Sequence, residues 1–145
     1  MATIRHMRYV FILLAICGIV VSSLALREHY REDQSPCSIN DKWDCGIVNK
    51  SQFAVIGKIP VAVIGIAGYL LLGVVGAIRR YRMLLAAAIV GLCFSLYLTY
   101  IEARVLEVWC IYCVISLGII SAIAVSAMTA VTAELVRASQ CKPNV

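Results

Sequence analysis

Four long apolar runs dominate this 145-residue sequence, near residues 9–26, 55–78, 83–101 and 111–136. A helix needs about 20 mostly apolar residues to cross a bilayer, and each run comes close to that length or exceeds it. Hydrophobic residues make up 62% of the chain, more than a soluble domain of this size can bury. We therefore predict an all-α membrane protein, a four-transmembrane-helix bundle that forms a single domain over residues 1–145.

The only long polar stretch, residues 27–52, follows the first run and forms the predicted long non-cytoplasmic loop. The first run has a second interpretation, because Arg5, Arg8, the apolar core and Ser22-Ser23-Leu24-Ala25 also fit a cleaved secretory signal. We favour a retained helix, since the run is long for such a signal and its removal would leave three helices. Either interpretation puts residues 27–52 on the same side of the membrane.

The distribution of charge predicts the orientation of the bundle. In residues 27–52, basic side chains are diluted by acidic ones, whereas the short turns and the ends of the chain carry mostly basic residues. Basic residues in short loops favour the cytoplasm, so we expect both termini and the turn after the second run to be cytoplasmic. The basic residues concerned are Arg5, Arg8, Arg79, Arg80, Arg82, Arg137 and Lys142. The net charge of +5 then reflects topology, and no basic patch with interleaved aromatic residues predicts nucleic-acid binding.

Three of the seven cysteines are expected to be inert. Cys17 and Cys93 lie in the middle of apolar runs, where a thiol behaves as a small hydrophobic group. Cys141 lies in the predicted cytoplasmic tail, where thiols stay reduced. The other four lie on the predicted non-cytoplasmic side, where disulfides form and persist: Cys37, Cys45, Cys110 and Cys113.

Cys110 and Cys113 form a Cys-Ile-Tyr-Cys motif at the start of the last apolar run. Residues three apart share one face of a helix, and the positive end of the helix dipole favours the nucleophilic thiolate. The motif lies at the predicted bilayer edge, within reach of a lipid-soluble oxidant. Such motifs also occur in zinc sites, but the oxidising side of a membrane favours redox chemistry, and we expect no metal.

Cys37 and Cys45 enclose seven residues of the polar loop. A disulfide between them could be a structural staple, worth roughly 2–3 kcal/mol by the chain-entropy model. Alternatively, the pair could exchange electrons with the helix motif on the same side of the membrane. The residues alone leave both interpretations open.

The chain resembles the vitamin K epoxide reductase family and its bacterial homologues. The resemblance rests on the order Cys37-x7-Cys45, then Ser51, then the second helix, then the Cys110–Cys113 motif opening the fourth helix. It implies that Cys110 and Cys113 are the active-site pair, with Cys113 meeting a quinone and Cys110 resolving it. It also implies that Cys37 and Cys45 shuttle electrons to Cys110, and that Ser51 donates a hydrogen bond to the quinone.

Two positions depart from the animal enzymes of that family. Lys58 stands where they carry an asparagine, and Leu117 stands where they carry a tyrosine beside the quinone. These differences favour an ordinary respiratory quinone, ubiquinone or menaquinone, over an epoxide. Many bacterial relatives carry a fused thioredoxin-like domain, for which this sequence ends too soon, so the resemblance implies a separate redox partner.

We therefore predict a thiol:quinone oxidoreductase of the bacterial inner membrane. Electrons would come from a separate periplasmic thioredoxin-like (DsbA-like) protein and pass through both cysteine pairs to a membrane quinone, driving disulfide formation. Vitamin K epoxide reduction proper is the first alternative. A non-enzymatic membrane protein with two structural disulfides is the second.

Overall fold

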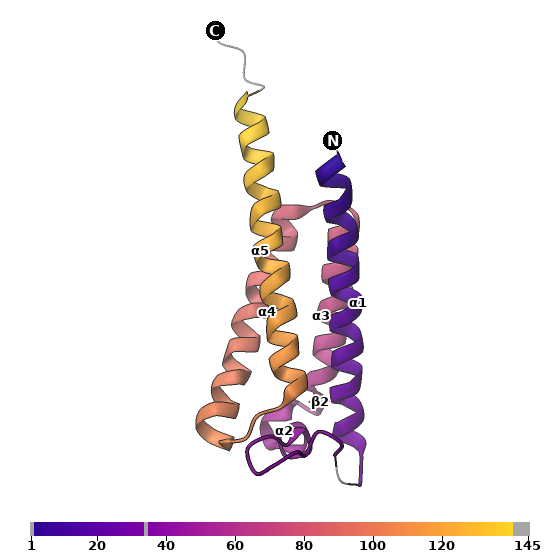
Figure 1. The fold of residues 1–145 in the computed structure, drawn as a ribbon, viewed down its shortest axis with the longest axis vertical. Helices are drawn as coiled ribbons and strands as arrows, with labels where there is room; N and C mark the ends of the chain where they lie inside the picture. The colour runs from indigo at the N-terminus through magenta and orange to yellow at the C-terminus, as the bar shows by residue number, and fades with distance from the viewer. Residues whose placement is uncertain (1, 34, 141–145) are drawn as a thin grey trace.

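The protein is described by a computed structural model over residues 2–33 and 35–140, so Cys141 and Lys142 lie outside the described residues. Four long helices run side by side: α1 (Ala2–Tyr30), α3 (Val61–Ala77), α4 (Tyr81–Ile101) and α5 (Ile111–Gln140) (Figure 1). The start of α1, the turn between α3 and α4 and the end of α5 lie at one end of the bundle. The polar loop and the short helix α2 (Cys45–Lys50) lie at the other. The predicted all-α four-helix bundle is confirmed.

Among the described residues, three segments are long and apolar enough to cross a membrane: His6–Tyr30, Tyr81–Leu106 and Ile111–Gln140. Helix α3 is apolar but has only 17 residues, a length of about 26 Å against a hydrocarbon core of about 30 Å. Many large apolar side chains on the outer faces are exposed, among them Leu13, Leu71 and Val90. These faces suit lipid, and the chain is a multi-pass membrane protein.

The predicted start of the second helix is wrong. Residues 55–60 form a two-stranded hairpin, with β1 (Val55–Ile56) antiparallel to β2 (Ile59–Pro60). Gly57 and Lys58 make the turn, both with positive φ (56° and 81°), as a tight two-residue hairpin turn requires. Helix α3 starts directly after Pro60, because a proline ring fixes φ and suits the residue before or at the first helical turn.

Four further predicted boundaries, in α1, α4 and α5, are also displaced. Helix α1 continues past residue 26 to Tyr30, so the polar loop begins later than expected. Helix α4 starts at Tyr81 and continues beyond residue 101 into a π-helical segment, η2 (Glu102–Leu106). Helix α5 starts at Ile111 as predicted but extends beyond residue 136 to Gln140.

Small residues let α1 approach α3 closely. A Cβ atom added at Gly73 would lie 3.0 Å from Cβ of Ala15, and one at Gly76 would lie 2.8 Å from Cβ of Phe11. Helix α1 packs mainly on α3 and α5, and α4 packs mainly on α5, whereas α3 and α4 touch sparingly. Helices α3 and α4 therefore leave room between them.

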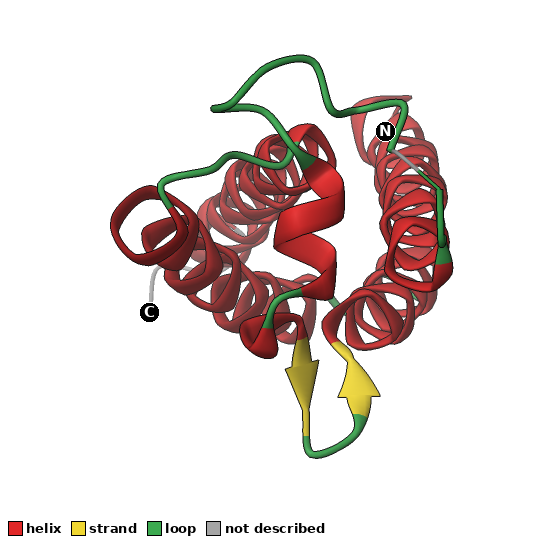
Figure 2. Ribbon diagram, turned by 90° about the horizontal axis from the view of Figure 1, so that it is seen from below, coloured by secondary structure: helices red, strands yellow, loops and turns green. Residues whose placement is uncertain are grey.

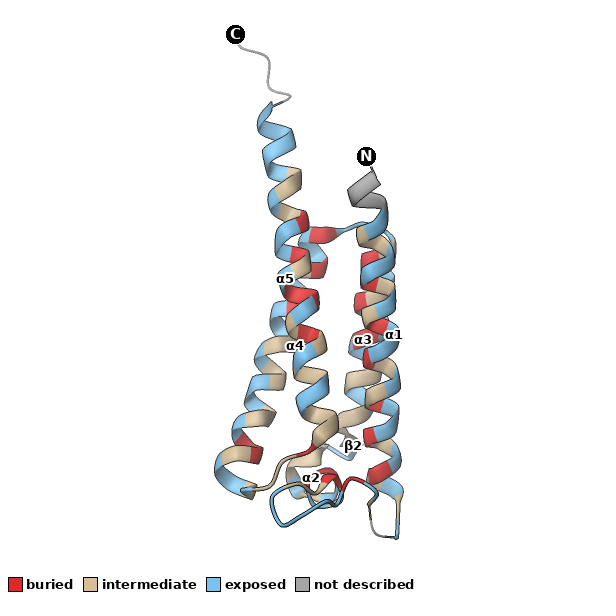
Figure 3. Ribbon diagram, in the orientation of Figure 1, coloured by how far each residue is buried: buried red, intermediate tan, exposed pale blue. Residues whose placement is uncertain are grey.

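Buried side chains gather in two regions (Figure 3). The larger cluster lies between the helices in the half of the bundle that contains the α3–α4 turn and includes Phe11, Leu84 and Ile123. The smaller cluster lies at the other end and consists of Cys37, Cys45, Val48 and Cys110. Three predicted redox cysteines thus form a packed core of their own.

Candidate active site

Helix α2 lies across the end of the bundle, as Figure 2 shows when the molecule is viewed along the helices. Cys45 is its first residue, and Asp44 is its N-cap, with Oδ1 accepting a hydrogen bond from the Ile47 amide at 3.0 Å. The hydroxyl of Ser38 donates to the other carboxylate oxygen, and this bond lowers the pKa of Asp44. The cap therefore fixes where α2 begins and where Cys45 points.

Backbone hydrogen bonds join the loop that precedes Cys45 to the segment that precedes Cys110. The Asp44 amide donates to the Trp109 carbonyl at 3.1 Å, and the Trp109 amide donates to the Lys42 carbonyl at 2.8 Å. The rings of Trp43 and Trp109 lie beside each other, with centroids 6.3 Å apart. Two segments more than 60 residues apart are thus paired immediately before a cysteine of each predicted pair.

Cys37 and Cys45 are joined by a disulfide, with Cα atoms 5.5 Å apart. Cys45 is fully buried and Cys37 almost so, at 6% exposure. A small groove beside Cys37 is lined by Pro36, Ile39, Ile111 and Tyr112. Cys37 is thus the member of the pair nearer to the surface.

Cys110 and Cys113 are free thiols in different surroundings. Cys110 is fully buried in the small cluster with Cys37 and Cys45. A hydrogen bond from the Cys113 thiol lowers the pKa of Cys110, which favours the thiolate at this residue. Cys113 is only partly buried and lines a cavity, whereas Cys110 is not part of the cavity wall.

Asn49, on α2, connects the two cysteine pairs. Its side-chain amide donates to the Cys45 carbonyl at 2.8 Å and lies 3.5 Å from the Cys110 sulfur. The backbone carbonyl of Asn49 accepts a hydrogen bond from Nδ1 of His29, at the end of α1, at 2.5 Å. This network holds α2 and Cys45 against Cys110.

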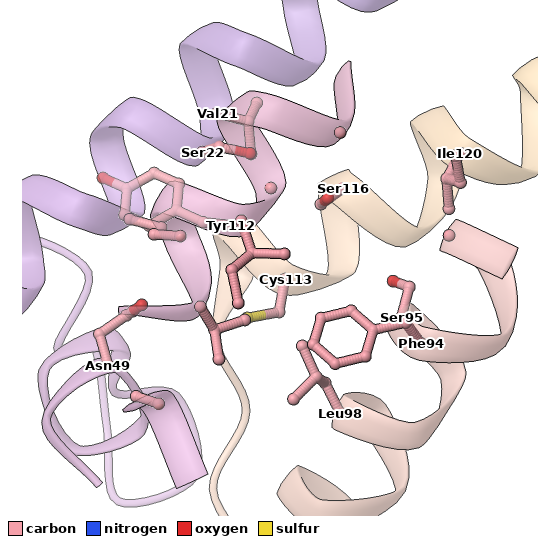
Figure 4. Close-up of a pocket in the computed structure, with 18 of the residues that line it drawn as sticks. Val21, Ser22, Asn49, Phe94, Ser95, Leu98, Tyr112, Cys113, Ser116 and Ile120 are labelled. Atoms are coloured by element: carbon pink, nitrogen blue, oxygen red, sulfur yellow. The ribbon is translucent and has the colours of Figure 1, made fainter. Parts of the chain in front are cut away.

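The cavity has a volume of about 640 Å³ and lies between α3 and α4, with further walls from α1, α2, η2 and α5. Figure 4 shows the Cys113 sulfur inside it, with Phe94 and Leu98 on one side and Asn49 on the other. Leu71 and Val90 line the cavity and are also exposed, so it opens sideways between α3 and α4. Its size suits a small organic ligand, and most of its wall is apolar.

The two predicted ligand contacts outside the cysteines lie in different places. Ser51 lines the cavity, and its hydroxyl donates to the Val48 carbonyl at 2.8 Å. Leu117 packs against the larger buried cluster and is not part of the cavity wall. Successive helical residues point about 100° apart, so Ser116 faces the cavity while Leu117 turns away. A contact between Leu117 and the quinone stays a prediction.

Sequence reasoning missed two polar residues of this site, Asn49 and Glu102. Glu102 is the first residue of η2, is 2% exposed, and lines the cavity. An acidic residue within an apolar membrane segment is itself a functional signal, but the predicted helix ended one residue before it. Asn49 carries no such signal, because its role comes from the fold of α2.

Residues 9–129 match the model of a protein family described as the vitamin K epoxide reductase family. No curated protein matches the chain.

Proposed function

Because the chain belongs to the vitamin K epoxide reductase family, we propose that it is a membrane thiol:quinone oxidoreductase in which both cysteine pairs carry electrons. The observation that carries the proposal is the difference in surroundings between the neighbouring thiols of Cys110 and Cys113. Cys110 packs with the loop disulfide, and Cys113 faces an apolar cavity that opens sideways between two helices. A lipid-soluble quinone suits a cavity of that size, lining and position.

The proposed electron path consists of three exchanges. A thiol of the partner attacks Cys37, and the loop disulfide is reduced while the partner becomes oxidised. The Cys45 thiolate then attacks Cys110 of an oxidised helix pair and releases Cys113, and Cys37 resolves the Cys45–Cys110 bond. The helix pair finally gives two electrons and two protons to the quinone and becomes a disulfide again. The net reaction converts a partner dithiol and a quinone into a partner disulfide and a quinol.

The arrangement of sulfurs supports this order. The loop pair is bridged and the helix pair is free, which is the state that the scheme requires directly before the quinone is reduced. Cys37 borders the surface groove, while Cys45 is fully buried, so an outside thiol has the shorter approach to Cys37.

We also propose that the cysteine end faces the periplasm of a bacterium, with the protein in the inner membrane. The basic residues Arg79 and Arg80 lie in the turn between α3 and α4, at the end of the bundle opposite the cysteines. Positive charge in so short a turn favours the cytoplasm. The partner would then be a separate thioredoxin-like protein, and the acceptor ubiquinone or menaquinone.

The direct test is turnover of the purified protein in lipid discs with a reduced thioredoxin-like protein and short-chain analogues of ubiquinone or menaquinone. We expect quinol to form in step with the partner's disulfide. No quinol from either analogue would overturn the proposal. Vitamin K epoxide is assayed in parallel, and faster turnover of the epoxide than of both quinones would favour epoxide reduction instead.

A side chain that fills part of the cavity should weaken quinone binding. Gly68 lines the cavity and has no atom within 4 Å of an added Cβ, so Gly68→Leu should fold and occupy ligand space. We expect the KM for quinone to rise about tenfold, as the loss of a few good contacts predicts, with the exchange between the cysteine pairs unchanged. Steady-state kinetics in lipid discs measure the KM for quinone.

Gly118 provides the matched control for this substitution. It is also a helical glycine with no atom within 4 Å of an added Cβ, but it lies outside the cavity wall. Gly118→Leu should leave the KM for quinone unchanged. Equal KM values for the Gly68→Leu variant and the unaltered protein would place the quinone elsewhere.

A further inference from the structure

The reaction proposed above moves protons as well as electrons, and the cysteine pairs alone do not explain how protons cross an apolar cavity. Two thiols become a disulfide, so a proton leaves each sulfur, and a proton must reach each quinone oxygen. The thiol of Cys113 lies in a cavity whose wall is mostly apolar. A polar group that faces the same cavity as Cys113 is therefore needed.

Glu102 meets that requirement. Glu102 and Cys113 line the same cavity, and Oε2 of Glu102 accepts a hydrogen bond from the Cys110 amide at 3.1 Å. The side chain is 2% exposed and lines the cavity. One carboxyl thus binds the backbone at the start of α5, the helix that carries Cys113, and lines the space where the quinone would bind.

The second oxygen of this carboxyl is unused. Oε1 of Glu102 is buried and has no hydrogen-bond partner among the residues that the structure describes. Two other polar side chains in the wall are engaged: the Tyr69 hydroxyl bonds to Ser116, and the Asn49 amide bonds to Cys45 and lies beside the Cys110 sulfur. A buried polar atom without a partner is costly, and such an atom beside a reacting thiol calls for a function.

The surroundings of Glu102 suit a group that alternates between two charge states. No cation pairs with it among the described residues, and an unpaired buried carboxylate is costly. The Cys110 amide and the positive end of the α5 dipole offset part of that cost. Glu102 also begins a π-helical segment, a feature that often marks functional sites.

We propose that Glu102 carries a proton from the Cys113 thiol to the quinone. As the Cys110–Cys113 bond forms, two electrons pass to the quinone and Glu102 takes the proton that Cys113 loses. Glu102 then gives this proton to the nearer quinone oxygen, and the other oxygen receives the proton that leaves Cys110. Glu102 ends the cycle as it began, so the reaction stays balanced. This inference rests on the proposed function.

Glu102→Gln tests the proposal, because glutamine keeps the shape of the side chain and an oxygen that accepts from Cys110 but does not carry a proton between partners. Exchange between the two cysteine pairs should persist, since it does not involve the quinone. We expect kcat for quinone reduction to fall about 100-fold, the usual scale for general acid–base catalysis. The KM for quinone should not change, and the solvent deuterium isotope effect on kcat should increase.

Two companion variants complete the design. Glu107→Gln removes a nearby exposed carboxyl outside the cavity and should leave kcat unchanged. Glu102→Asp keeps a carboxyl and should recover part of the turnover that Glu102→Gln loses.

The possible outcomes separate the two proposals. No quinol from the unaltered protein would overturn the proposed function itself. Quinol from the unaltered protein and an equal kcat in Glu102→Gln would overturn only the role of Glu102. A loss of turnover in both Glu102 variants together with a lower melting temperature would assign Glu102 a structural role and overturn it too.

Discussion

Cys113→Ala is expected to stop quinone reduction, with a loss of at least about 10³-fold, the scale on which enzymes lose turnover when a reacting nucleophile is removed. Of the four proposed redox cysteines, Cys113 lines the cavity, and without Cys113 the Cys110 thiol has no partner with which to form the proposed helix disulfide. Without that bond, two electrons do not leave the pair. The measurement is the rate of quinol formation with a reduced partner protein in lipid discs.

Cys113→Ser and Cys93→Ala are the controls for this result. Serine fills the site with a polar group of similar size. If the sulfur itself reacts, Cys113→Ser should therefore lose as much turnover as Cys113→Ala. Cys93 is a free, exposed thiol on α4 outside the cavity wall, so Cys93→Ala should keep full turnover. Turnover retained by Cys113→Ala would contradict the assignment of this thiol to the quinone.

Cys45→Ala is expected to stop electron entry from the partner but to spare the last step. The fully reduced protein should give about two quinols per chain, because each of its two pairs carries two electrons. Fully reduced Cys45→Ala should give about one, from Cys110 and Cys113 alone, and should then fail to turn over with the partner. Rapid mixing with excess quinone counts the quinols.

Cys17→Ala is the matched control, since Cys17 is exposed on α1 and has no part in either pair. It should give the same yield as the unaltered protein. Equal quinol yields from Cys45→Ala and the unaltered protein, with normal turnover of the variant, would mean that the loop disulfide is only structural. The same result would favour a structural role for the Cys37–Cys45 disulfide over a role in electron transfer.

Patterns in the sequence predicted the bundle well, because membrane helices follow from apolar length. The starts of α4 and α5 lie within two residues of the predicted positions. The start of α3 was misplaced because residues 55–60 are as apolar as a helix and only Gly57, Lys58 and Pro60 mark the hairpin. An apolar run does not reveal where a tight turn interrupts it.

The sequence predicts four redox cysteines because their type, spacing and expected side of the membrane all carry chemical meaning. The surroundings of these cysteines could not be predicted from the sequence. Trp43 and Trp109 pair their segments only once the bundle has formed, and Asn49 reaches Cys110 only because α2 lies across its end. A position taken from a resemblance does not fix which way a side chain points, and Leu117 packs on the larger buried cluster outside the cavity wall.

Electron transfer between the two pairs is the central claim, and trapping the bond between Cys45 and Cys110 tests it most directly. In the double variant Cys37→Ala/Cys113→Ala, each pair keeps only the thiol proposed to cross between them. Peptide mapping without reduction, after mild oxidation in lipid discs, identifies the bond. The reciprocal variant Cys45→Ala/Cys110→Ala should form far less of a Cys37–Cys113 bond. We expect a Cys45–Cys110 disulfide as the main product, and the persistence of both residues as free thiols would mean that electrons do not pass between the two pairs.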